Sequence, residues 1–94
     1  MSDAESERAF PAALPNGEPG RALGYAGGVL RLVCEQAHPP GEPLALTLRL
    51  DSGELALQGK SAGCKRRADA GFDVALRLHS LRREQREQLA ALWA

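Results

Sequence analysis

Leucine alternates with other residues in three runs of the second half of the chain. Every second residue from 44 to 50 is leucine, and Leu55 and Leu57 repeat the pattern after a turn at 51–53. A third alternating run spans 72–78. Because successive side chains of a strand point to opposite faces, each run predicts a strand buried on one face. The predicted inward residues of the first and third runs are Leu44, Leu46, Leu48, Leu50, Phe72, Val74, Leu76 and Leu78.

The last residues of the chain, 80–93, predict a helix. Ser80 is the expected N-cap, because its hydroxyl can accept hydrogen bonds from the amides of the first turn. Together the strands and this helix predict a mainly β fold, a small antiparallel barrel of about five or six strands with a C-terminal α-helix. The helix face expected to pack on the barrel carries Leu81, Gln85, either Gln88 or Leu89, and Leu92, with Trp93 beside it.

The first half of the chain gives weaker strand signals. Val29–Cys34 is the most apolar run and predicts a central strand. Residues 8–14 predict an irregular edge strand, since Pro11 cannot donate to a ladder. A short strand is expected over 21–25. The chain of 94 residues is expected to form one domain over 8–94, preceded by a disordered acidic N-terminus at 1–7.

Composition indicates the cellular compartment and the state of the cysteines. The formal net charge is zero, and no apolar run reaches the length of a membrane span, so we expect a cytoplasmic protein without membrane insertion. Cys34 and Cys64 are then expected to be reduced, structural thiols. No CxxC spacing occurs, and His38 and His79 do not sit in a ligand pattern around the cysteines. We therefore expect no metal and no cofactor.

Catalysis is not indicated by any motif. His38 and His79 are the only histidines, and neither has a neighbouring nucleophile in a recognised arrangement. The Gly27-Gly28 pair lacks the lysine that a phosphate-binding loop needs. The sequence therefore predicts a protein that is not an enzyme.

The order of these segments resembles a PilZ domain, a bacterial signalling module. The matching pieces are a glycine-led apolar strand at 27–30, a proline-glycine loop at 40–44 and a strand that ends in Gly59-Lys60. A second glycine-led strand follows at 71–78, and the final helix carries Arg86 and Leu89 three residues apart. The resemblance covers about two thirds of the chain, counted from Gly28 to Trp93, and its specificity lies in the order of its parts.

Both motifs with which PilZ domains bind cyclic di-GMP are degenerate in this chain. Arg8 occupies the first place of the Arg-x-x-x-Arg motif, but Ala12 stands at the second. In the Asp/Asn-x-Ser-x-x-Gly motif only Gly28 remains, because Leu23 and Tyr25 replace the polar residues. A site built on hydrogen bonds to a base loses affinity without those groups. The resemblance therefore implies a member that does not bind the nucleotide and acts through protein partners in type IV pilus assembly and twitching motility.

Two alternatives remain open. The segment Leu46–Gly59 also resembles the first motif of Sm-like RNA-binding barrels, which would imply RNA binding and a ring-shaped homo-oligomer. Against this, Sm-like proteins usually place their helix before the barrel, and aromatic residues for base stacking are scarce here. The second alternative is a cyclic di-GMP receptor with an atypical site, for which Arg8, Arg21 and Arg31 are the first residues to test.

Two surfaces are candidates for contact with a protein partner. One is the apolar turn around Leu23, Tyr25 and Val29, because tyrosine combines a large apolar ring with a polar tip and is enriched at interface hot spots. The other is the arginine face of the final helix. Each has a plain structural alternative, in which Tyr25 packs in the core and the arginines are only solvated. The arginine face consists of Arg82, Arg83 and Arg86.

Overall fold

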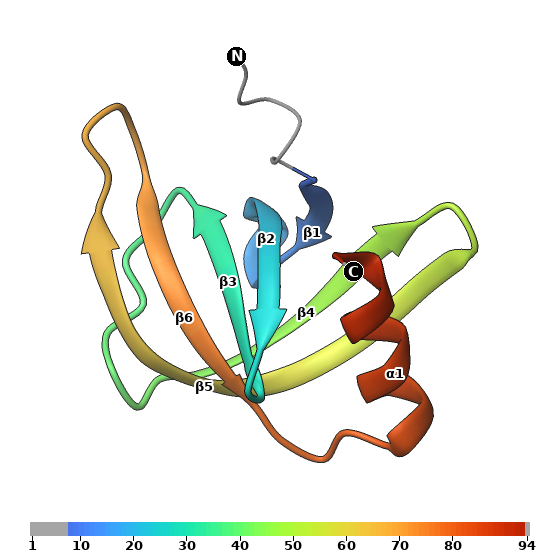
Figure 1. The fold of residues 1–94 in the computed structure, drawn as a ribbon. Helices are drawn as coiled ribbons and strands as arrows, with labels where there is room; N and C mark the ends of the chain where they lie inside the picture. The colour runs from blue at the N-terminus through green and yellow to red at the C-terminus, as the bar shows by residue number, and fades with distance from the viewer. Residues whose placement is uncertain (1–7, 94) are drawn as a thin grey trace.

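The protein is a closed barrel of six antiparallel strands followed by one helix (Figure 1). The computed structural model describes residues 8–93. Around the barrel the strands follow the order β1-β2-β3-β6-β5-β4, and β4 pairs with β1 to complete the circle. The predicted fold class is therefore confirmed. The elements are β1 (Phe10–Ala13), η2 (Pro15–Gly17, a short 3-10 turn), β2 (Pro19–Ala26), β3 (Val29–Cys34), β4 (Pro43–Leu50), β5 (Gly53–Arg66), β6 (Phe72–Leu78) and α1 (Arg83–Leu92).

The alternating residues of β4 and β6 face the interior, as predicted. Leu50 and Phe72 are half-buried at strand ends and still pack against the core, whereas Arg77 is exposed. A one-residue slip would have reversed this pattern, so the hydrophobic period alone specifies the register. The fully buried members of the predicted set are Leu44, Leu46, Leu48, Val74, Leu76 and Leu78.

Strand β5 is longer than the leucine pattern indicates. It continues from Gly53 to Arg66, first along β4 and then along β6, and a bulge lies between Ser61 and Gly63. Gly59 sits where β5 pairs with both neighbours, opposite Leu44 and Leu78. A Cβ atom at Gly59 would collide with the backbone of Arg77. The close approach of these strands therefore requires glycine at position 59.

The N-terminal strands complete the barrel wall. Strand β1 is not an edge strand, because it pairs with β2 on one side and with β4 on the other. The sequence suggested an edge because of Pro11, but Ala12 and Ala13 make the contact with β4. Strand β2 extends beyond the expected 21–25 at both ends. Its pairing with β3 contains a bulge in which Leu23 is the extra residue.

Strands β2 and β3 are joined by the Gly27-Gly28 turn. Both glycines have positive φ, 59° and 81°, as the favoured two-residue hairpin turns require. The carbonyl of Gly28 accepts a hydrogen bond from the amide of Leu78 at 3.0 Å. The turn thereby links the β2–β3 hairpin to the end of β6.

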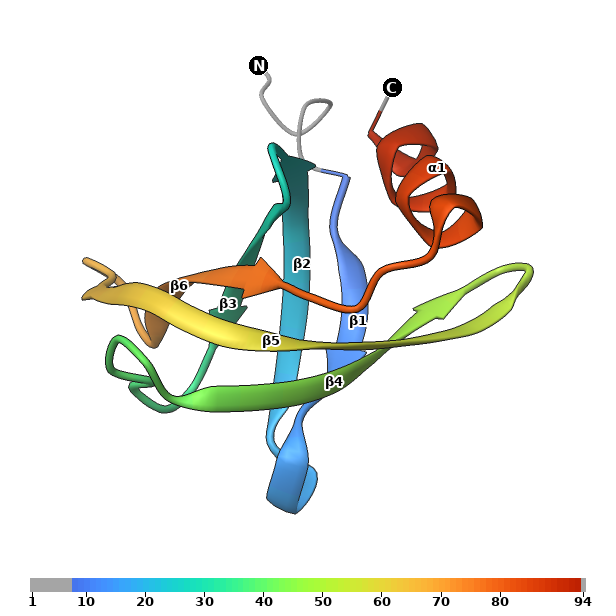
Figure 2. The same ribbon diagram turned by 90° about the horizontal axis from the view of Figure 1, so that it is seen from below.

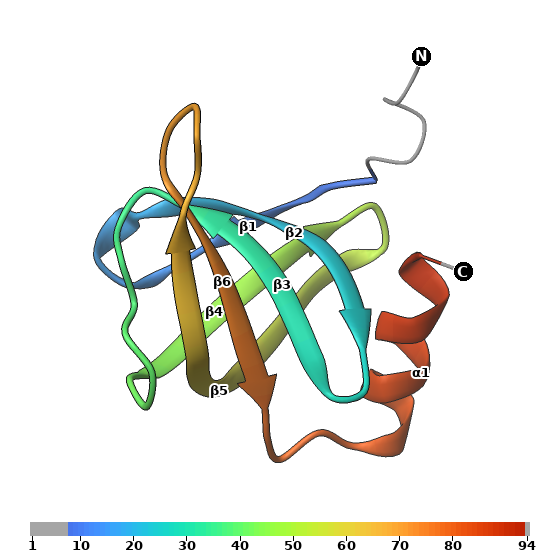
Figure 3. The same cartoon turned by 60° about the vertical axis from the view of Figure 1, so that its left-hand side comes forward.

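Helix α1 lies at the end of the barrel that carries the β4–β5 hairpin and the last residues of β2, as the views in Figures 2 and 3 agree. It is shorter than the predicted 80–93, because Ser80 has a φ of 60° and is not helical. Arg82 is the N-cap instead, and its amide donates to the side chain of Gln85 at 3.0 Å. Leu89 is completely buried and joins the barrel core.

The prediction for residues 1–7 lies outside the described part of the chain. Within residues 8–93, no helix combines the length and the apolar character that crossing a bilayer demands.

Candidate functional site

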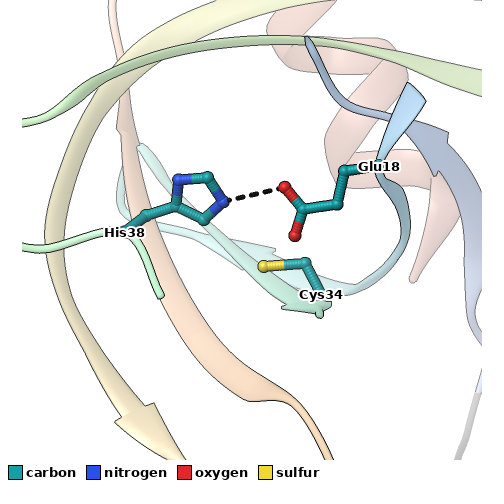
Figure 4. A group of neighbouring side chains, drawn as sticks. All are labelled: Glu18, Cys34 and His38. Carbon is teal, nitrogen blue, oxygen red and sulfur yellow. Dashed lines mark hydrogen bonds and ion pairs between the residues drawn. The ribbon is translucent and has the colours of Figure 1, made fainter. Parts of the chain in front are cut away.

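Three buried side chains with metal-binding or proton-carrying atoms converge at the end of the barrel opposite α1 (Figure 4). Glu18 precedes β2, Cys34 ends β3, and His38 lies in the loop between β3 and β4. Their exposed fractions are 7%, 3% and 6%. Polar side chains this deeply buried need partners within the protein, and these three find them in one another and in the surrounding loop. We call Glu18, Cys34, His38 and the adjoining Glu42 the polar cluster.

Strand register brings the polar cluster together. Gly20 pairs with Cys34 across the β2–β3 ladder, so the residues before β2 run beside the loop that follows β3. The amide of Gln36 donates to Oε2 of Glu18 at 2.8 Å. The β2–β3 ladder thereby places Glu18 beneath the loop that follows β3.

The loop that carries His38 is held on β5 by Ser61. The Ser61 hydroxyl donates to the carbonyl of His38 at 2.6 Å, and the Ser61 amide donates to the carbonyl of Glu42 at 2.9 Å. The amide of Gly41 in turn donates to the carbonyl of Ser61 at 2.7 Å. These bonds position the imidazole of His38 rigidly at the mouth of the barrel.

His38 lies between two carboxylates. Its Nε2 is 3.1 Å from Oε1 of Glu18, and its Nδ1 is 2.6 Å from Oε2 of Glu42. Burial by itself would lower the pKa of His38, but the hydrogen bonds to Glu42 and Glu18 outweigh it and raise the pKa above the ordinary 6.5. Both ring nitrogens therefore act as donors when the imidazole is protonated, and the imidazolium balances part of the buried negative charge.

Cys34 completes the cluster as a protonated thiol. Its Sγ donates to the carbonyl of Gln36 at 3.3 Å. Burial, followed by the charge of Glu18 nearby, raises the pKa of the Cys34 thiol to about 12. A thiol nucleophile works as the thiolate, so a buried cysteine with a raised pKa is inert toward substrates. The Cys-His-Glu combination therefore does not have the electrostatics of a nucleophilic site.

The residue that the PilZ resemblance places at the phosphate position contacts the C-terminal helix. The Arg8 guanidinium donates from Nη1 to the carbonyl of Leu92 at 3.0 Å, and the carbonyl of Arg8 accepts from Nε1 of Trp93 at 2.6 Å. The rings of Trp93 and Phe10 meet edge to face, with centroids 5.1 Å apart. The end of α1 is thus attached to the start of β1, next to Arg8.

The other residues that the PilZ resemblance aligns with the nucleotide motif are part of the barrel wall and its turn. Leu23 is half-buried in the β2 bulge, and Gly28 forms the β2–β3 turn. Tyr25 is half-buried, stands opposite the buried Leu30 and packs against the core. Of these residues, the structure places Arg8 in contact with the end of α1 and Tyr25 against the barrel core.

The arginine face of α1 is fully accessible. Arg82, Arg83 and Arg86 are all exposed, while the side of the helix that carries Leu89 is turned into the barrel. The Nε of Arg83 lies 4.0 Å from Oε2 of Glu87, an exposed pair of the usual helical spacing. Such pairs contribute only about 0.3–0.5 kcal/mol. The guanidinium groups therefore remain free to approach an acidic partner.

The polar cluster was missed by sequence analysis. The sequence shows no metal-ligand pattern around the cysteines, yet one ring nitrogen of His38 lies within 4.8 Å of a donor atom of Cys34 and of Glu18. Cys34 and His38 are close in the sequence, so their proximity could have been expected. Glu18 joins them only because β2 pairs with β3 in this register, which the sequence does not define. Cys34 and Cys64 are both free thiols, as predicted.

Comparisons with known proteins returned no match: no family model, no curated protein and no solved structure corresponds to this chain.

Proposed function

We propose that this protein is a non-catalytic adaptor domain that works by binding a protein partner. It would act like the PilZ domains that have lost cyclic di-GMP binding, in bacterial signalling connected with type IV pili and motility. The observation that carries the proposal is the contact between Arg8 and the end of α1. The arginine that would grip a phosphate is engaged by the protein's own C-terminal residues, so the barrel is left with surfaces suited to macromolecules.

The architecture supports a PilZ-like over an Sm-like origin. Within residues 8–93 the α-helix follows the barrel, which is the order that the PilZ resemblance implies. The β1–β4 pairing, through Ala12 and Ala13, closes the barrel and so leaves less strand edge for the pairing between subunits that builds Sm-like rings. Phe10 and Trp93 pack on each other, which leaves them poorly placed to stack on RNA bases.

The arginine face of α1 is the contact surface that we favour. Arg82, Arg83 and Arg86 lie within little more than one helical turn and are exposed together. Arginine is enriched at protein interfaces because its planar guanidinium can bind a carboxylate through two parallel hydrogen bonds. Tyr25 is half-buried and packs against the core, so it offers less accessible surface than these exposed arginines. The partner is therefore expected to present acidic side chains.

The proposal is tested with two charge-reversed triple variants, each first shown by circular dichroism to be folded. One carries Arg82→Glu, Arg83→Glu and Arg86→Glu. The matched control reverses three exposed arginines of the barrel wall, at positions 21, 31 and 77. Affinity capture followed by a quantitative binding measurement with the recovered, purified partner should show at least a tenfold loss for the helix variant and little change for the wall variant.

Two results would contradict the proposal. Equal binding of the parent protein and both variants would remove the arginine face from consideration. Recovery of RNA by the parent protein, with no protein partner, would replace the adaptor with the Sm-like alternative. A Tyr25→Ala variant, measured in the same assay, reports separately on the turn near α1.

A further inference from the structure

We propose that Glu18, Cys34 and His38 form a zinc-binding site, with Glu42 as the positioning residue that orients the His38 ring. The site lies at the end of the barrel opposite α1, so the proposal is independent of the adaptor function. One carboxylate oxygen of Glu18, Sγ of Cys34 and one ring nitrogen of His38 lie within 4.8 Å of one another. We assign Oε1 and Nε2, which are 3.1 Å apart, as the ligand atoms of Glu18 and His38.

The geometry around His38 requires a cation between the ring and Glu18. At 2.6 Å from the Glu42 carboxylate, Nδ1 must carry a hydrogen and donate it. The neutral ring then turns the lone pair of Nε2 toward Oε1 of Glu18, only 3.1 Å away. Two lone pairs facing each other in a buried place repel, so the gap is stable only when it holds a positive charge. A proton on Nε2 is one solution, and a metal ion is the other.

Cys34 favours the metal over the proton. A proton shared by His38 and Glu18 needs no third donor, whereas one donor atom each from Cys34, His38 and Glu18 lie within 4.8 Å of one another (Figure 4). Zinc bonds of about 2.0–2.3 Å in a tetrahedron place neighbouring ligand atoms about 3.3–3.8 Å apart. The present Nε2–Oε1 distance of 3.1 Å is close to that value. Side-chain shifts of the order of 1 Å would bring Sγ into the same geometry.

The donor set selects the metal. A thiolate, an imidazole and a single carboxylate suit zinc, whereas magnesium and calcium prefer several oxygen ligands. Glu42 supplies the carboxylate that commonly orients a zinc-bound histidine through its second nitrogen. The second oxygen of Glu18 is already held by the Gln36 amide at 2.8 Å, which leaves Oε1 for the ion. Glu42 contacts the far side of the ring, so a water molecule would take the fourth position.

Charge balance allows the ion to enter this buried place. Binding forms bonds from zinc to Nε2, Sγ and Oε1, and it releases the Nε2 proton of the imidazolium and the thiol proton of Cys34 to solvent. The ion brings two positive charges and the two released protons carry two away, so the net charge of the polar cluster is unchanged. Zinc therefore enters without adding a buried charge, and coordination compensates the cost of deprotonating the thiol.

Cobalt(II) is the probe, because a tetrahedral cobalt–thiolate site has visible and near-ultraviolet absorption bands that zinc lacks. Titration of the reduced parent protein near neutral pH should give a thiolate-to-cobalt charge-transfer band that saturates at one ion per chain and disappears when zinc is added. Cys34→Ser and His38→Gln should abolish the band. The matched controls Cys64→Ser and His79→Gln should retain it.

Glu42→Gln tests the positioning role. The variant should keep the same cobalt spectrum, since the three ligands are unchanged, and should bind zinc about 10–100-fold more weakly. A purely structural role for Glu42 would not produce weaker binding with an unaltered spectrum.

A second measurement uses only the parent protein, so it does not depend on the folding of variants. Zinc should slow alkylation of Cys34 after partial unfolding in mild denaturant and leave the alkylation rate of Cys64 unchanged, as mapped by mass spectrometry. Absence of both the cobalt band and the protection of Cys34 would overturn the proposal. A band that depends on Cys64 or His79 would do the same, and His38 would then be an imidazolium bridging two carboxylates.

Discussion

Nε2 of His38 lies 3.1 Å from Oε1 of Glu18, although 20 positions separate the two residues in the sequence. The β2–β3 ladder creates this contact, because Gly20 and Cys34 are directly opposite each other. Glu42 then holds the other ring nitrogen at 2.6 Å. A buried histidine between two carboxylates couples the protonation of one side chain to the stability of the barrel.

The first prediction concerns the pH dependence of stability, measured with a chelator present so that no metal contributes. The pKa of His38 is raised in the folded protein, so the folded protein binds the His38 proton more tightly than the unfolded chain does. Its contribution is complete below the unfolded pKa of about 6.5 and is lost as the pH rises through the raised folded pKa. Urea unfolding should therefore show that the advantage of the parent protein over His38→Gln shrinks as the pH rises above about 6.5.

His79→Gln is the control for this experiment, since His79 is exposed and its ring contacts only the hydroxyl of Ser80. The comparison separates the loss of a buried imidazole from the loss of an exposed one. An advantage of the parent over His38→Gln that grows with pH would contradict the assignment of His38 as a donor to both carboxylates.

The second prediction concerns the docking of α1. Leu89 is completely buried among barrel residues, whereas the neighbouring Gln88 is exposed. Leu89→Ala removes buried methyl groups and leaves a cavity, so it should lower the free energy of unfolding by about 2–5 kcal/mol. Gln88→Ala should change it by less than about 0.5 kcal/mol. Equal effects in denaturant unfolding would mean that the helix is not packed through Leu89.

The third prediction concerns the crossing of β5 and β6. A Cβ atom at Gly59 would meet the backbone of Arg77, whereas one at Gly24 would have open space. Gly59→Ala should therefore reduce stability by about 1–3 kcal/mol, because the two strands must move apart. Gly24→Ala should stay within about 1 kcal/mol of the parent protein. If thermal unfolding shows that Gly59→Ala is tolerated as well as Gly24→Ala, the strands do not approach as closely as described.

The sequence predicts the elements whose period is regular. Leu44, Leu46 and Leu48 repeat at the period of a strand, and burial of one face leaves a single register, so their orientation was predictable. The continuation of β5 beyond Gly59 was not, because its second half has no alternation and curves around the barrel through a bulge. The start of α1 was placed too early, because Ser80 is a good N-cap by residue type but occupies a left-handed turn.

The polar cluster depends on contacts that the sequence does not reveal. Glu18 stands in a turn rich in proline and glycine, where a carboxylate is ordinarily solvated. Only the pairing of β2 with β3 places it under the His38 loop, and only the Ser61 hydroxyl fixes that loop on β5. Residues that meet through two separate ladders carry no common spacing, so a motif search cannot find them.

Calorimetry with cyclic di-GMP tests most directly the proposal that this chain is a PilZ-like domain that does not bind the nucleotide. The titration uses the full chain at physiological salt, with an intact cyclic di-GMP receptor as the positive control. No heat of binding is expected, because Arg8 contacts Leu92 and Trp93 and because the remaining motif positions are substituted. Ala12 stands in place of the second arginine of one PilZ motif, and Leu23 and Tyr25 stand in place of the acidic and serine side chains of the other. Micromolar or tighter binding would contradict the account and would direct mutagenesis to Arg8, Arg21 and Arg31.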